Sequence, residues 1–154
     1  MIDSLLAALS EAVIEIAQTM LFIEIAVGPS RVQGELQNAD VSAVVGYGGG
    51  LNGGLRLGGS LEVALRLAGA LVGEPRIAWD QELEDAFGEM ANMIAGGVQS
   101  RVEATLGPIT LTPPMVIQGK NHQITGQQPS SRLCQDFEID GVVFFCEIYF
   151  TLPA

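Results

Sequence analysis

The sequence predicts one α+β domain in which long helices pack against a β-sheet. The chain has 154 residues, of which 48% are hydrophobic and 16% charged, so a core of ordinary size can form without disulfides or metals. Apolar residues recur with helical spacing in three segments, and the remaining apolar runs have strand-like patterns. These segments occur in the order helix, strands, helix, helix, strands, which is typical of α+β proteins.

Residues 4–20 are predicted to form the first helix, with Ser4 as its N-cap. The following segment LFIEIAVG, residues 21–28, has the composition of a strand that ends at Gly28-Pro29. The helix residues that recur at spacings of three and four, and should face the core, are Leu5, Leu9, Ala12, Val13, Ile16 and Met20.

Two further strands are predicted at Val41–Tyr47 and Gly53–Gly59. The turn between them contains Gly48-x-Gly50-x-x-Gly53, which has the spacing of a dinucleotide-binding fingerprint. That fingerprint needs a helix directly after the glycines, so that phosphates meet free backbone N–H groups. The residues that follow, LRLGG, are strand-like, and we therefore interpret the glycines as a hairpin turn.

Two helices with clear boundary signals come next. The first begins after Ser60, which can act as its N-cap, and ends at Gly73. The second begins after Asp80, a second N-cap residue, and is predicted to end at Leu106, before a Gly-Pro pair. The second helix is unusually long.

The rest of the chain is predicted to form strands. Their sequences are ITLTPPMVIQG (109–119), QDFEID (135–140) and VVFFCEIYFTL (142–152), with a hairpin turn at Asp140-Gly141. The segment Lys120–Arg132 is rich in Asn, Gln, Ser and Pro, and we interpret it as a loop or a poorly packed hairpin.

Charge and cysteine content argue against several functions. Seven basic and 18 acidic residues give a formal charge of −11, which disfavours binding to nucleic acid or to an anionic membrane. Cys134 and Cys146 have no metal-ligand spacing and His122 belongs to no motif, so we expect reduced thiols and no metal site. The N-terminus has no signal-peptide pattern, and Glu24 interrupts the apolar run at 20–27. We therefore expect a cytoplasmic protein.

The long helix carries a polar stripe that core packing does not explain. At about 100° per residue, Asp85, Glu89, Asn92 and Gly96 fall within roughly 60° of one another. This side of the helix is either solvated or used for function, and a Glu-x-x-Asn pair alone occurs by chance on many exposed helices. The apolar residues gather on the opposite side: Leu83, Phe87, Met90, Ile94 and Val98.

The first helix repeats this pattern. Its segment EAVIEIAQTM aligns with DAFGEMANMI of the long helix at a constant offset, which places Glu15 and Gln18 where the long helix has its Glu and Asn. The shared order of acid, glutamate and amide predicts an internal duplication of a helix-plus-strands unit. The pseudo-repeats would occupy roughly residues 1–59 and 60–154 of a single domain.

The motif Asp85-x-x-x-Glu89-x-x-Asn92 resembles the signature of the CheC/CheX/FliY family of chemotaxis phosphatases. The layout also resembles that family, which has a tandem duplication with two long helices packed on a sheet. The family pattern includes a proline about two dozen residues after the asparagine. Pro113 and Pro114 lie slightly short of that spacing, so neither is assigned a role.

Within the family, the chain looks most like CheX. Its length fits CheC or CheX and not the longer FliY. Gln18 stands where the signature would have an asparagine in the first helix. The resemblance therefore implies one intact site, Glu89 and Asn92, and leaves Glu15 and Gln18 as a candidate degenerate second site.

The resemblance implies a substrate, the aspartyl phosphate of a CheY-like response regulator. Asn92 would orient the attacking water, because an amide both donates and accepts hydrogen bonds. Glu89 would form a charge-assisted hydrogen bond with the lysine of the regulator's active site. Asp85 and Gly96 would contact the partner beside these two residues.

The resemblance also implies that this chain needs no cofactor, since the Mg²⁺ of the reaction belongs to the receiver. CheX-like relatives form homodimers through their sheets, and residues 142–150 could supply either an edge strand or a central one. An alternative function is a non-catalytic adaptor that binds a response regulator or another chemotaxis protein through the same helix face. The degenerate first site and the acidic surface motivate this alternative.

Overall fold

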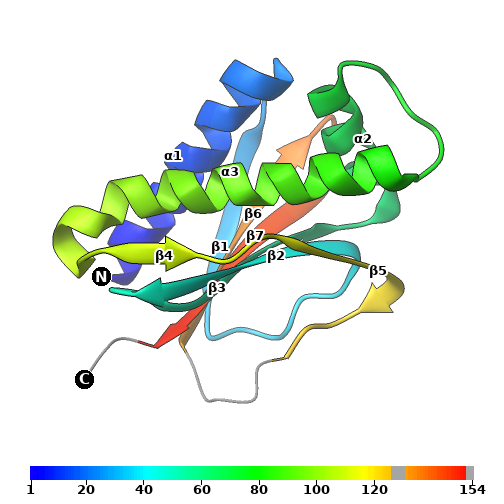
Figure 1. The fold of residues 1–154 in the computed structure, drawn as a ribbon. Helices are drawn as coiled ribbons and strands as arrows, with labels where there is room; N and C mark the ends of the chain where they lie inside the picture. Colours follow the sequence, from blue (N-terminus) through cyan, green and yellow to red (C-terminus); the bar gives the residue numbers. More distant parts are fainter. Residues whose placement is uncertain (126–130, 152–154) are drawn as a thin grey trace.

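The computed structural model describes residues 1–125 and 131–151, and it has the predicted α+β fold. Figure 1 shows the helices on one side of an antiparallel sheet, with the long helix α3 crossing α1. The elements in chain order are α1 (Ile2–Ile16), the π-helical turn η1 (Ala17–Leu21), β1 (Ala26–Val32), β2 (Ala39–Gly49), β3 (Asn52–Gly59), α2 (Leu61–Val72), α3 (Gln81–Leu106), β4 (Ile109–Leu111), β5 (Met115–His122), β6 (Ser131–Ile139) and β7 (Val142–Thr151).

The strands of the described residues form one sheet in the order β1-β6-β7-β3-β2-β4. Both β4 and β5 pair with β2, at its end and along its first half respectively, so together they form one edge of the sheet. β7 lies between β6 and β3. The apolar run at residues 142–150 is therefore a central strand, which explains why its apolar residues are almost uninterrupted.

The hydrophobic core lies between the sheet and the helices. Alternate residues of the central strands point towards the helices, as the period of two in a strand requires. The five apolar residues predicted for the buried side of α3 are all between 0% and 2% exposed. The strand residues that meet them include Val41, Ala43, Val45, Leu55, Leu57, Phe144, Cys146 and Ile148.

The opposite face of the sheet holds a buried polar cluster. Arg56 is 1% exposed; its Nε donates to Ser42 Oγ (3.0 Å) and its Nη1 to the Gln37 carbonyl (2.9 Å). The Glu147 carboxylate lies 3.9 Å from the same Nη1. Burial raises the pKa of Glu147 and lowers the pKa of Arg56, since it disfavours both charges.

The boundaries of α2 and α3 follow the predicted capping signals. At the start of α2, Ser60 Oγ accepts a hydrogen bond from the Val63 N–H (3.2 Å), and α2 ends at Gly73 with a φ of 90°. At the start of α3, Asp80 Oδ1 accepts from the Leu83 N–H (3.0 Å). These predictions are confirmed.

The glycine-rich turn is a β-hairpin, as predicted. β2 and β3 are paired from Val41–Gly59 to Tyr47–Gly53. Gly49 has a φ of 93°, a conformation that favours glycine in the turn. A strand follows the glycines, so the turn lacks the helix N-terminus of a dinucleotide-binding site.

Both ends of the first helix differ from the prediction. The helix begins before Ser4, and Met1 is its N-cap without a side-chain hydrogen bond. At the other end, Ala17–Leu21 form a π turn. Met20 is consequently 44% exposed, and Leu21 takes the core position with 5% exposure. A period of 3.6 residues could not predict this shift, because a π turn contains more residues than an α turn.

The first helix is also long and apolar enough to cross a membrane. The segment Ile2–Leu21 meets the length and hydropathy criteria for a membrane-spanning helix. However, 44% of its most apolar 18-residue stretch is buried inside the fold. α1 packs against α3 and β6. Its apolar residues therefore serve the core.

The first predicted strand is displaced towards the C-terminus. β1 begins at Ala26 and continues through Gly28-Pro29, where the prediction had ended the strand. β1 is an edge strand, and its register against β6 shifts between Val27 and Ser30. An edge position with a bulge is where a strand tolerates proline, because the missing N–H breaks no regular ladder bond.

Later strands also need correction. Residues 109–119 form two strands, because Pro113 and Pro114 interrupt the pairing with β2, while the Thr112 N–H still donates to the Gly46 carbonyl (3.0 Å). Two adjacent prolines cannot donate to a strand ladder, which explains the break. The predicted loop Lys120–Arg132 is partly strand at both ends, in β5 and β6, and its residues 126–130 lie outside the described residues.

The helices α1 and α3 are in close contact at Ala12 and Gly97. A Cβ atom added to Gly97 would lie 2.9 Å from Ala12 Cβ, closer than packed carbon atoms approach. A Cβ atom added to the adjacent Gly96 would meet nothing within 4 Å. Packing of the two helices therefore requires a glycine at 97, and nothing in the described fold requires one at 96.

Alanine substitutions at these two glycines should have opposite effects on stability. Gly97→Ala should lower the free energy of unfolding by about 1–3 kcal/mol, because the added methyl group overpacks the helix crossing. Gly96→Ala should raise it by about 0.5–1 kcal/mol, because alanine is the better helix former. Urea denaturation of the two variants measures both changes. Stabilisation by Gly97→Ala would contradict the crossing geometry.

The Asp40 carboxylate joins three elements. Its Oδ1 accepts from the Asn121 N–H near the end of β5 (2.9 Å), and its Oδ2 accepts from the Leu61 N–H at the start of α2 (3.1 Å). These two bonds lower the pKa of Asp40 below its ordinary value of 3.8. The charged form therefore stabilises the fold above that ordinary value.

Stability should consequently fall with acid in a way that depends on Asp40. The stabilisation is lost as the pH falls through the depressed pKa of the folded state. Asp40→Asn should flatten the loss of stability below about pH 4. Urea denaturation at a series of pH values measures this, with Asp3→Asn on the exposed start of α1 as the control. Identical acid profiles for wild type and Asp40→Asn would refute the assignment.

Candidate functional site

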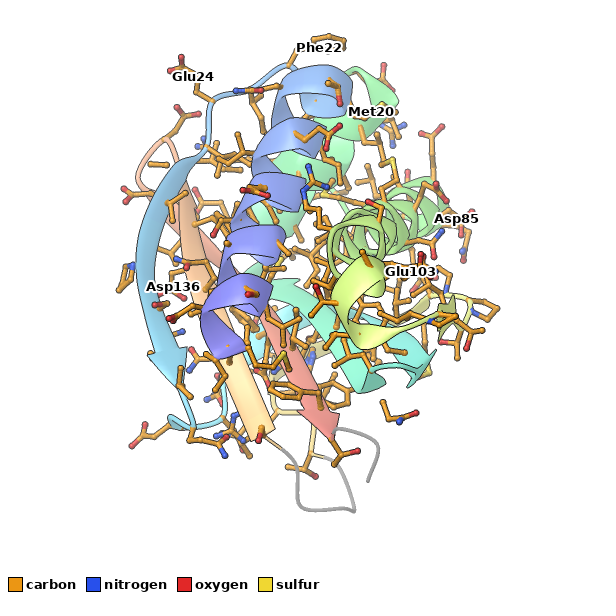
Figure 2. All side chains as sticks on the ribbon, turned by 90° about the vertical axis from the view of Figure 1, so that its left-hand side faces the viewer. Met20, Phe22, Glu24, Asp85, Glu103 and Asp136 are labelled. Carbon is orange, nitrogen blue, oxygen red and sulfur yellow. The ribbon has the colours of Figure 1, made fainter. Side chains whose placement is uncertain are left out.

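The polar stripe lies on the outer side of α3. Asp85 and Glu89 are exposed, and Asn92 and Gly96 are half-buried. Figure 2 shows Asp85 pointing outward from this helix. The opposite side of α3 is fixed against α1, α2 and the sheet, so the stripe is carried by a rigid element.

Glu89 and Asn92 are free of internal side-chain bonds. The nearest hydrogen bonds between two side chains of α3 run from Gln81 to Asp85 (2.9 Å) and from Gln99 to Glu103 (3.2 Å). Between these pairs, neither Glu89 nor Asn92 makes an ion pair or a side-chain hydrogen bond with any residue of 1–125 or 131–151. Both groups are therefore available to a partner.

A shallow hollow adjoins the stripe where α3 meets the β4–β5 connection. Its volume is about 270 Å³, and Pro114 is part of its wall. A Cβ atom added to Gly88 would lie 3.2 Å from Val116 Cγ2, so glycine lets α3 approach β5 closely. Pro114, which received no role from the sequence, thus lies beside Asp85 and Glu89, and Asn92 is not part of the lining.

The equivalent residues of the first helix are in a different state. Glu15 Oε2 lies 2.6 Å from Arg101 Nη2 on α3, and the neighbouring Glu11 lies 3.3 Å from Arg101 Nε. Gln18 is exposed within the π turn and lines a separate hollow. A cation of the same chain therefore pairs with the acid of this copy, whereas Glu89 of the long helix has no such partner among residues 1–125 and 131–151.

Arg101 is the residue near these motifs that sequence reasoning missed. Its contact with Glu15 spans 86 positions of the chain. No local pattern predicts such a pair. The alignment of the two helices contains no position for Arg101, because it lies beyond the aligned segment.

The cysteines are not reactive groups of a site. Both are free and buried, as predicted. Burial raises the pKa of Cys134 to about 12 and also raises the pKa of Cys146. Both thiols are thus protonated at neutral pH and are poor nucleophiles.

Among the residues that the structure describes, no three His, Cys, Asp or Glu side chains are grouped to hold a metal ion.

The fold and the site define an α+β protein that carries its polar stripe on the outer side of a helix. Glu89 and Asn92 project from a helix surface, and the adjoining hollow does not enclose Asn92. The family model described as "Chemotaxis phosphatase CheX" matches residues 41–138. The chain belongs to this CheX family, and the resemblance noted in its sequence is confirmed.

Solved structures share the fold over nearly the whole chain. The chemotaxis protein CheX from Desulfovibrio desulfuricans is 26% identical with a TM-score of 0.86, covering 96% of this chain and 99% of that chain. A chemotaxis protein from Desulfovibrio vulgaris Hildenborough is 26% identical with a TM-score of 0.87, covering 96% of each chain. No curated protein sequence gives a significant match.

A third similar structure is a complex. The CheX-CheY-BeF₃-Mg²⁺ complex from Borrelia burgdorferi contains a chain that is 27% identical to this one, with a TM-score of 0.78. The match covers 97% of this chain and 96% of that chain. In that protein, the same fold forms a complex with CheY.

Proposed function

We propose that this chain is a phosphatase that hydrolyses the aspartyl phosphate of a CheY-like response regulator. The observation that carries the proposal is the contrast between the two helices. Glu89 and Asn92 are presented without internal partners, whereas Arg101 holds Glu15 of the first helix at 2.6 Å. Membership of the CheX family and the Borrelia complex with CheY support the choice of partner.

Asn92 acts on the attacking water. An aspartyl phosphate is intrinsically labile, so holding a water in line with the phosphorus gives useful acceleration. The Asn92 side-chain carbonyl accepts a hydrogen bond from that water. As the water oxygen bonds to phosphorus, the bond to the aspartyl oxygen breaks, leaving a carboxylate on the regulator and releasing inorganic phosphate. The phosphate group takes up the proton, because an amide cannot act as a base near neutral pH.

Glu89 positions the helix on the regulator. An exposed carboxylate without an internal cation can form a charge-assisted hydrogen bond with the lysine of the regulator's active site. Asn92 lies three residues further along the helix, so it is on the same side and enters the site with Glu89. The metal and most charge stabilisation come from the regulator.

Asn92→Ala should abolish the acceleration of dephosphorylation. We expect a loss of about 10²-fold, or a return to the regulator's own rate, because the water is no longer positioned. The measurement follows phosphate loss from a phosphorylated CheY-like protein of the same organism. Gln18→Ala is the matched control in the first helix and should retain full activity.

Two outcomes would change this conclusion. Equal acceleration by wild type and Asn92→Ala would remove Asn92 from the reaction and direct attention to Gln18. Binding of the phosphorylated regulator without any acceleration by the wild-type chain would favour the adaptor function.

Glu89→Gln separates the role of Glu89 in binding from the role of Asn92 in catalysis. This variant should weaken binding of the regulator more than it lowers the rate at saturating regulator.

A side chain at Gly96 should interfere with partner binding and not with folding. The position faces open space in this chain, so Gly96→Gln should leave the unfolding midpoint unchanged or raised. We expect the Kd for the phosphorylated regulator to rise by roughly tenfold, because bulk one turn beyond Asn92 holds the partner away. Titration calorimetry and thermal unfolding measure the two effects. An unchanged Kd would place Gly96 outside the interface.

A further inference from the structure

An apolar hollow lies where the end of η1 meets α2. Its volume is about 520 Å³, and it shares no lining residue with the hollow beside Glu89. Figure 2 shows Met20, Phe22 and Glu24 together at one end of the molecule. The apolar residues that line the hollow are Leu21, Phe22, Ile23, Leu65, Ala70 and Ile139.

Phe22 is exposed and adopts an unfavourable backbone conformation. Its residue exposure is 82% and its φ is 55°. A bulky side chain disfavours the left-handed region, and an exposed aromatic ring gives up the stabilisation that burial provides. The backbone of Phe22 caps η1 by donating its N–H to the Ala17 carbonyl. Glycine or asparagine performs that capping role with less strain, so the fold does not require the phenyl ring.

The basic groups at the rim of the hollow are neutralised within the chain. Arg66 pairs with Asp140 at 3.0 Å. Arg76 pairs with Glu74 at 2.9 Å and with Asp80 at 2.8 Å. These two arginines therefore contribute little free positive charge to the surface.

Carboxylates dominate the charge next to the hollow. A second hollow of about 550 Å³ shares Ile23 and Asp140 with the first, and its lining includes Glu24 and Glu138 but no arginine or lysine. Neither Glu24 nor Glu138 has an ion-pair partner among residues 1–125 and 131–151. An apolar depression with unpaired carboxylates on one side selects a ligand that is apolar in the centre and basic at its margin.

We propose that this end of the chain binds a basic amphipathic helix of a partner protein. The binding region, here called the Phe22 surface, consists of Leu21–Ile23, Leu65, Gly69 and Ala70. The apolar face of the helix occupies the hollow against the phenyl ring, and its Lys or Arg side chains meet Glu24 and Glu138. This is the helix-in-groove mode of recognition, in which an exposed aromatic residue acts as the anchor.

A synthetic peptide tests the Phe22 surface directly. The probe is an amphipathic helix of about 14 leucine and lysine residues, long enough to span a helical groove. The control peptide keeps the leucine positions and replaces every lysine by glutamate. Backbone NMR spectra of the full chain should shift for the leucine/lysine peptide at residues 20–24 and 65–70. The leucine/glutamate peptide should bind at least about tenfold more weakly.

Phe22→Asn tests the anchor. Asparagine tolerates the left-handed region, so this variant should keep or raise the unfolding midpoint while weakening peptide binding by roughly tenfold or more. Ile77→Asn is the matched control, because Ile77 is 97% exposed and does not line the hollow. Ile77→Asn should change neither the unfolding midpoint nor the affinity for the peptide. Phe22→Asn should not affect dephosphorylation of the receiver. The peptide-binding proposal and the phosphatase proposal can therefore be refuted separately.

Four results would overturn the proposal. The first is no binding of the leucine/lysine peptide at the Phe22 surface, and the second is equal binding of both peptides. The third is destabilisation by Phe22→Asn, which would make the ring a structural element. The fourth is binding of the chain itself, without peptide, to phosphatidylglycerol vesicles that Phe22→Asn abolishes, which would make the surface a membrane contact despite the charge of −11.

Discussion

The close contact between Ala12 of α1 and Gly97 of α3 determines how the long helix is oriented. Because residue 97 has no side chain, the two helices approach closely. A Cβ atom added to Gly97 would lie only 2.9 Å from Ala12 Cβ. Gly88 gives α3 a similar approach to Val116 of β5. These two contacts, together with the buried apolar side of α3, hold the helix in one rotation about its own axis. Once that rotation is fixed, the helical period alone places Glu89 and Asn92 on the outer side. The site thus depends on glycines that take no part in its chemistry.

The same crossing makes the two helices chemically unequal. The strand pairing is symmetric in the way that a duplication requires, since β1 pairs with β6, β5 pairs with β2, and β3 pairs with β7. The duplication itself stays a prediction. Arg101 lies one turn beyond Gly97 and donates to the Gly97 carbonyl (2.9 Å), which brings its guanidinium to Glu15. The acid of the first helix is therefore already paired, whereas the acid of the second is not.

The sequence predicted the features that local signals encode. Caps such as Ser60 and Asp80 act within three residues, and the buried side of α3 follows from a regular period, so both were correct. The first helix deviated where its period changed, in the π turn at Ala17–Leu21. The role of Arg101 could not be predicted, because its contact with Glu15 depends on how two distant helices cross. The outward side of α3 was predicted from the helical period, and the structure exposes Asp85 and Glu89 there. The position of Pro114 beside them depends on the packing of β5 against α3, which no local signal encodes.

The π turn at the end of the first helix shapes the Phe22 surface and leaves the spacing of Glu15 and Gln18 unchanged. Ile16 and Ala17 keep α-helical backbone angles, so Gln18 follows Glu15 with the same spacing that Asn92 keeps relative to Glu89. The same turn ends in the left-handed conformation of Phe22, which directs an aromatic ring outward at 82% exposure. On the two proposals made above, the first helix differs from the long helix in the ion pair of Glu15 with Arg101 and in the exposed ring that follows its π turn. A chain of this kind can hold a partner protein through its first helix while its long helix remains free for the regulator.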